Sequence, residues 1–172
     1  MTTETVERTR RVLRPLNLTP TPVTRPFKVN QAFLNKGNGQ VKIYDWGRNF
    51  GDWFVDKEET GAPAPLSVYV IEPEGGSSYA YDRDIVADLG GEEVAKIAMA
   101  DFWDQIVIQG HGQPGQLHVD GRANIGYAED AKGVFRVVSA DRFWDGWLFD
   151  AYGFPDPSWW DVGDHVLAPR NS

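Results

Sequence analysis

The chain has 172 residues, no cysteine and a formal net charge of −8 at pH 7. This length fits one domain with a core of its own, and the lack of cysteine excludes disulfides, zinc–thiolate sites and thiol catalysis. No apolar run reaches the length of about 18 residues that a membrane span needs, and the N-terminus lacks the apolar segment of a signal peptide. We therefore expect no membrane partner and a protein of the cytoplasm or of a particle.

The charge is distributed unevenly along the chain. Residues 1–28 contain six basic and two acidic side chains, whereas residues 29–172 contain 11 basic and 23 acidic ones. Four prolines between residues 15 and 26 favour extended backbone. We predict an extended basic arm over residues 1–28 and a single acidic globular domain over residues 29–172. The arm side chains expected to contact a partner are Arg8, Arg10, Arg11, Arg14 and Arg25.

The first half of the domain is predicted to contain short elements. The turn-forming residues 35–40 separate residues 31–34 from residues 41–46, which predicts a hairpin. Residues 53–55 and 67–72 are expected to be strands. Residues 82–89 are expected to form a short helix that Gly90 closes.

The centre of the chain begins with a helical pattern. Val94, Ile97, Ala98 and Phe102 recur at helical spacing after two glutamates, which predicts a helix at about 91–105. The β-branched run at 106–108 predicts a buried strand, and the alternation at 117–121 predicts another.

The C-terminal third is predicted to contain one helix between strands. Residues 133–139 form a strand pattern, and Ser139 then resembles the N-cap of a helix at about 140–152 whose apolar face ends before Gly153 and Pro155. Residues 158–169 suggest two short strands around Gly163-Asp164. The predicted fold class is α+β, a small mixed or antiparallel sheet of about 6–8 short strands with two main helices.

The segment Gly110–Gly115 matches G-x-G-x-x-G, the phosphate-binding pattern of dinucleotide sites. In such a site the third glycine opens a helix, but here Pro114 lies inside the motif and a strand pattern follows. We predict a surface loop and no nucleotide site.

Three side chains have the spacing of metal ligands. His118 and Asp120 are two residues apart and would share one face of a strand, and His165 lies on a later predicted strand. This order resembles the two-histidine, one-carboxylate iron site of the jelly-roll oxygenases. The resemblance implies Fe²⁺ held by His118, Asp120 and His165. The competing interpretation is an ordinary surface His–Asp pair.

Two further features concern partners and the core. Residues 141–164 contain eight aromatic side chains among six aspartates, more rings than one amphipathic helix would bury. Trp159 and Trp160 point apart if this backbone is extended, so at least one of them is expected to contact a partner. Asp101 falls on the apolar face of its predicted helix, where a buried aspartate is costly unless it is partnered; the alternative is a rotated helix that lets Asp101 reach solvent.

These observations favour a non-enzymatic structural subunit of a larger assembly, such as a phage virion or another multi-subunit particle. It would dock through its arm and its Trp-rich C-terminal surface onto other protein subunits, including copies of itself, without a cofactor. Nucleic acid is expected only at the arm, because the domain is acidic. The alternatives are an iron oxygenase or cupin-like enzyme, and an acidic inhibitor or immunity-type protein that occupies the basic site of an enzyme.

Overall fold

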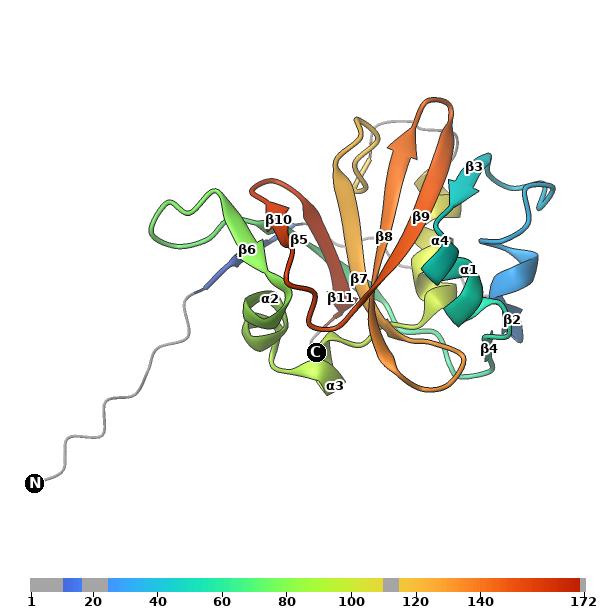
Figure 1. Ribbon diagram of the computed structural model, residues 1–172, viewed down its shortest axis with the longest axis horizontal. Coiled ribbons are helices and arrows are strands. Elements are labelled where there is room, and N and C mark those ends of the chain that lie inside the picture. The colour runs from blue at the N-terminus through green and yellow to red at the C-terminus, as the bar shows by residue number, and fades with distance from the viewer. Residues whose placement is uncertain (1–10, 17–24, 110–114, 171–172) are drawn as a thin grey trace, which may run out of the picture.

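A computed structural model describes residues 11–16, 25–109 and 115–170 of the chain (Figure 1). Its main feature is a mixed seven-stranded sheet, which confirms the predicted α+β class. Within this sheet β11 is parallel to β7 and β3 is parallel to β9, and the other neighbours are antiparallel. The strands, in spatial order, are β1 (Leu13–Pro15), β5 (Leu66–Ile71), β11 (His165–Pro169), β7 (Ala123–Glu129), β8 (Phe135–Phe143), β9 (Gly146–Gly153) and β3 (Ile43–Trp46).

Helices cover both faces of the sheet (Figure 1). One face carries α1 (Arg48–Phe54) and α4 (Met99–Gln109), next to η1 (Val29–Gln31) and the small pair of β2 (Phe27–Lys28) and β4 (Glu58–Glu59). The other face carries α2 (Asp82–Leu89), α3 (Glu92–Ala95) and a two-stranded ribbon of β6 (Tyr79–Tyr81) and β10 (Trp159–Asp161). No helix in the described ranges has the length and apolar character needed to cross a membrane.

Each face has its own hydrophobic core. Phe33 is fully buried at the centre of the first, where its ring lies 5.6 Å from Phe50, 4.8 Å from Trp103 and 4.9 Å from Phe149. The second core surrounds the buried carboxylate of Asp82. That carboxylate accepts hydrogen bonds from the Tyr127 hydroxyl at 2.9 Å and from the Trp160 indole at 2.7 Å. A buried charge is tolerated when donors satisfy it in this way.

Parts of the predicted arm belong to the domain itself. Val12 and Leu13 are buried, and their backbone N–H groups donate to the Asp88 carboxylate at 3.0 and 2.9 Å. The Arg25 guanidinium lies 3.1 Å from Asp101, whose side chain is 1% exposed. Of the two alternatives for Asp101, the structure therefore has the buried, partnered one. Residues 11–16 and 25–28 therefore extend this chain's own sheet and core.

The predicted helix at 140–152 is wrong, because these residues form the hairpin of β8 and β9. Trp147, Phe149 and Ala151 alternate along β9 and enter the first core. Phe143 and Trp144 were expected on the buried face of a helix, and they are exposed at the hairpin tip. In the hairpin, β8 pairs with β7 and β9 pairs with β3. A helix at this place would leave the backbone groups of β7 and β3 without these partners.

Other local predictions also fail. The predicted helix at 91–105 is broken at Lys96–Ala98, where Ile97 donates its backbone N–H to Tyr127 at 2.8 Å. The predicted strand at 106–108 is instead part of the last turns of α4. Ile106 is buried in the core and Ile108 is exposed, so this run is not buried on both faces as predicted. Residues 31–34 do not pair with β3, residues 53–55 lie at the end of α1, and residues 117–121 form bends. The strand number of the main sheet, seven, does fall within the predicted 6–8, and the described ranges add two small two-stranded sheets to it.

Other local predictions of secondary structure are confirmed. They are the strand at 67–72, the helix at 82–89 with left-handed Gly90 after it, the strand within 133–139, and the two strands flanking Gly163-Asp164. Most of the Gly110–Gly115 segment lies outside the described residues.

Candidate functional site

The ribbon of β6 and β10 presents aromatic side chains outward. Trp159 is paired with Tyr81, Trp160 with Ala80 and Asp161 with Tyr79. Because side chains alternate along a strand, Trp159, Tyr79 and Tyr81 share the outer face, and we call these three residues the aromatic ribbon. Trp159 is 58% exposed, and its ring lies 5.7 Å from Tyr79. This arrangement confirms that the two tryptophans point apart.

The inner face of the same strands holds the aromatic ribbon in place. Trp160 donates its indole N–H to Asp82, and its ring lies 5.9 Å from Tyr152. Asp82 in turn accepts the backbone N–H of Asp156 at 3.2 Å, just before β10. The exposed rings are therefore carried on a backbone that is anchored to the second core.

Hollows surround the aromatic ribbon on several sides. The largest has a volume of about 420 Å³ and lies between the ribbon and the edge of β7 and β8. We call it the Asp141 pocket; its lining is Gly121, Arg122, Ala123, Asp141, Trp159, Trp160, Asp161, Val162 and Asp164. Two further hollows lie beside Asp156, one against Trp159 and Trp160 and one against Tyr81 and Arg83.

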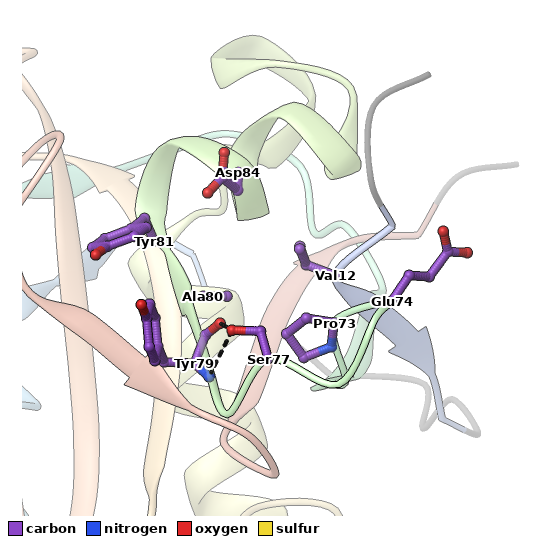
Figure 2. Close-up of a pocket in the computed structure, with 8 residues that line it drawn as sticks. All are labelled: Val12, Pro73, Glu74, Ser77, Tyr79, Ala80, Tyr81 and Asp84. Atoms are coloured by element: carbon purple, nitrogen blue, oxygen red, sulfur yellow. Dashed lines mark hydrogen bonds between the residues drawn. The ribbon is translucent and has the colours of Figure 1, made fainter. Parts of the chain in front are cut away.

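A fourth hollow lies beside the N-terminal strand and has a volume of about 210 Å³. Figure 2 shows its lining, with the Tyr79 and Tyr81 rings on one side and the Glu74 carboxylate pointing away from them. The Ser77 hydroxyl donates to the backbone carbonyl of Tyr79 at 2.9 Å and holds the loop that leads into β6.

Acidic side chains dominate the linings of these four hollows. They contain six carboxylates and two arginines, Arg83 and Arg122, which gives a formal charge of −4. Across the described ranges, none of the six forms an ion pair with a lysine, arginine or histidine. The six are Glu74, Asp84, Asp141, Asp156, Asp161 and Asp164.

Ion pairs are common elsewhere on the domain. Lys96 lies 2.8 Å from Glu129, Arg136 lies 2.9 Å from Asp130, and Arg14 pairs with Glu72. The surface around the aromatic ribbon therefore differs from the rest in both its exposed rings and its uncompensated negative charge.

Asp141 has the most perturbed carboxyl group of the Asp141 pocket. Burial, followed by the negative charges of Asp150 and Asp164, raises its pKa to about 7. Its Oδ1 atom is shielded from solvent and has no hydrogen-bond partner within the described residues. Asp164 differs, because its carboxylate accepts the backbone N–H groups of Ala123 at 3.2 Å and Asp161 at 3.0 Å. Asp164 thus shapes the turn between β10 and β11, whereas no hydrogen bond within the described residues uses Asp141 Oδ1.

The three residues predicted as metal ligands lie together behind the same turn. The rings of His118 and His165 stack with centroids 3.7 Å apart, and His118 Nδ1 lies 3.7 Å from Asp120 Oδ1. His118 Nε2 contacts the carbonyl oxygen of Gly163 at 2.6 Å, and His165 Nδ1 contacts that of Gln116 at 2.7 Å. Burial, followed by the positive charge of His118, lowers the pKa of His165 to about 4.

This arrangement does not fit an iron centre. A metal ion lies near the plane of each imidazole that binds it, about 2 Å from the nitrogen, and two stacked rings offer no such common point. In keeping with this, no three His, Asp or Glu side chains of the described segments are placed to hold a metal ion. The histidines instead contact backbone. His118 holds the β10–β11 turn through the carbonyl of Gly163, and His165 holds the segment before His118 through the carbonyl of Gln116. That turn forms one wall of the Asp141 pocket.

The arm residues predicted to bind a partner are in different situations. Arg8 and Arg10 lie outside the described residues, Arg11 is exposed and Arg14 pairs with Glu72. Arg25 is 11% exposed and bound to Asp101, so the folded domain uses it internally.

Sequence reasoning singled out Trp159 and Trp160 but not Tyr79, Tyr81 and Asp141, which lie around the same ribbon. The Tyr-Ala-Tyr alternation at 79–81 is a strand signal that was available. Asp141 was placed in a helix, which hid its proximity to Trp159.

Comparison of the chain with protein-family models, with curated proteins and with solved structures gives no match.

Proposed function

We propose that this chain is a non-enzymatic interaction subunit that binds another protein through the aromatic ribbon and the acidic hollows around it. The observation that carries the proposal is Trp159, a large ring that is 58% exposed on an anchored ribbon. Tryptophan and tyrosine are enriched among the residues that dominate binding energy at protein interfaces. A rigid strand presents them at low entropic cost.

The unpaired carboxylates indicate the charge of the partner. Six acidic side chains without counter-ions repel one another, and a basic protein surface would relieve that repulsion. The setting remains the one that composition suggests, a multi-subunit assembly such as a virion or another particle, with copies of this chain among the candidate partners. In the arm, Arg8, Arg10 and Arg11 are the basic residues left for such contacts.

The same carboxylates favour a second candidate function, an acidic inhibitor or immunity-type protein that occupies the basic site of an enzyme. Both functions use the same surface, and they differ in whether the partner is an enzyme that loses activity. The iron-enzyme alternative has no comparable support, because the stacked histidines do not fit a metal.

Native mass spectrometry of the tagged chain isolated from its own cells tests the proposal. We expect a metal-free complex with at least one further subunit, and we expect Trp159→Ala to lose that subunit. Trp144→Ala is the matched control, because Trp144 is 81% exposed at the hairpin tip, outside the aromatic ribbon and its hollows. A monomer carrying one transition-metal ion would overturn the proposal.

A further inference from the structure

We propose that the Asp141 pocket binds the guanidinium or ammonium group of a basic side chain that the partner protein presents. This inference rests on the proposed function and adds the chemical group that the partner must insert.

The lining of the pocket combines the two features that recognise an organic cation. Trp159 and Trp160 both line it, and indole rings attract cations through their electron-rich faces. Asp141, Asp161 and Asp164 line it as well, and carboxylates form strong charge-assisted hydrogen bonds with guanidinium and ammonium groups.

The chain's own cation in the pocket does not neutralise these acids. Arg122 Nε lies 3.9 Å from Asp120 Oδ2, outside the pocket lining, and its Nη1 atom lies against Gly163. Its guanidinium forms no ion pair with the pocket carboxylates, which leaves a formal charge of −2 among the lining residues.

Asp141 gives the pocket a specific acceptor. Its Oδ1 atom is shielded and has no hydrogen-bond partner among the described residues, and an unmade hydrogen bond at a buried carboxylate is costly. Because Asp141 lines the pocket, a cationic donor that enters would lie against its carboxylate and offset the repulsion from Asp150 and Asp164. Burial first and that repulsion second raise the pKa of Asp141.

A neutral sugar is the main competing occupant, since hydroxyl groups also donate to carboxylates and sugars stack on indole rings. The net negative charge of the lining favours the cation. The experiment therefore compares both ligands directly.

The test is an NMR titration of the full chain, followed through the Trp159 indole N–H signal, which Trp159→Phe assigns by its loss. The probes are N-acetyl-arginine amide, N-acetyl-lysine amide, the neutral isostere N-acetyl-citrulline amide, and methyl glucoside. We expect saturable shifts with the arginine or lysine probe, weaker at high salt, and none with the two neutral probes.

Asp141→Asn should weaken binding of the cationic probe by about tenfold or more, because it removes the charged acceptor but keeps the shape of the side chain. Asp52→Asn is the matched control: it makes the same change at an exposed carboxylate of α1, on the opposite face of the sheet, and should leave affinity within about twofold. The amide spectrum of each variant reports whether the fold is retained.

Three results would overturn the inference: equal binding of citrulline or glucoside, equal loss in both variants, or no saturable shift with either cationic probe. A chain that forms the complex in native mass spectrometry but binds no cationic probe would keep the proposed function and refute the pocket. A monomeric chain that binds arginine amide would refute the proposed function and keep the pocket as a cation site.

Discussion

At the scale of single residues, the perturbed carboxyl of Asp141 links the proposed site to stability. Its pKa in the folded chain is about 7, above the ordinary value of 3.8, so the folded state holds the proton more tightly than the unfolded state does. The stability contributed by this group is therefore present below about pH 4 and is lost as the pH rises from about 4 to 7.

Asp141→Asn should remove that loss. We expect the variant to be more stable than the wild type by about 1 to 3 kcal/mol at pH 8, and near equal to it at pH 4. Urea unfolding at the two pH values measures the difference. A variant that gains nothing at pH 8 would show that Asp141 finds a compensating partner in solution.

The buried pair of Arg25 and Asp101 should respond in the opposite way, because a substitution there lowers stability. Arg25→Ala leaves the Asp101 carboxylate unpaired in the core and should cost about 3 to 5 kcal/mol of unfolding free energy. The control is Arg14→Ala, which breaks the exposed pair with Glu72 and should cost at most about 1 kcal/mol. Equal losses in urea unfolding would mean that the Arg25 pair is as solvent-screened as a surface pair.

At the scale of elements, the hairpin of β8 and β9 turns at a strained residue. Trp144 has a φ of 53°, a left-handed conformation that asparagine tolerates better than other side chains with a Cβ. We expect Trp144→Asn to stabilise the domain by about 0.5 to 1 kcal/mol. Trp144→Ala removes the same ring but keeps the strain, so thermal unfolding should separate the two variants. If they unfold alike, the turn carries no strain that asparagine can relieve.

The same hairpin shows why part of the fold escaped prediction. Phe143, Trp147 and Ala151 fit a helical spacing, and Trp147, Phe149 and Ala151 equally fit the alternation of a strand. Ser139 as a helix cap favoured the helix, and the two-residue turn Trp144-Asp145 between Phe143 and Gly146 has no glycine or asparagine at its first position to mark a hairpin. Where one pattern was available, as at 67–72 and 82–89, the prediction holds.

At the scale of the whole molecule, the sequence could not show which parts of the basic segment join the domain. Its prolines and charges favour an extended arm, and β1 is indeed extended, but its partner is β5, more than fifty residues away in the chain. Asp101 could be noted as a carboxylate on an apolar helix face, whereas its partner Arg25 was assigned to an interface. Pairing over such distances depends on the finished sheet, which local patterns do not contain.

Because β1 belongs to the sheet, two truncations can separate it from the residues that precede it. Removing residues 1–10 keeps β1 and should change the unfolding free energy by less than about 0.5 kcal/mol. Removing residues 1–16 also deletes Val12 and Leu13, which are both buried. Burial of one such side chain contributes about 1.5 to 3 kcal/mol, so the longer truncation should lose about 3 to 6 kcal/mol in urea unfolding.

The two truncations also separate folding from assembly. If the basic side chains Arg8 and Arg10 contact a partner, the chain lacking residues 1–10 stays folded and loses subunits in native mass spectrometry, and its difference from the wild type shrinks as salt screens the arm's charges. If the aromatic ribbon alone carries the contact, that chain assembles like the wild type and only Trp159→Ala dissociates it. Equal stability of the two truncated chains would instead place β1 outside the cooperative core, against the burial of Val12 and Leu13 and their hydrogen bonds to Asp88.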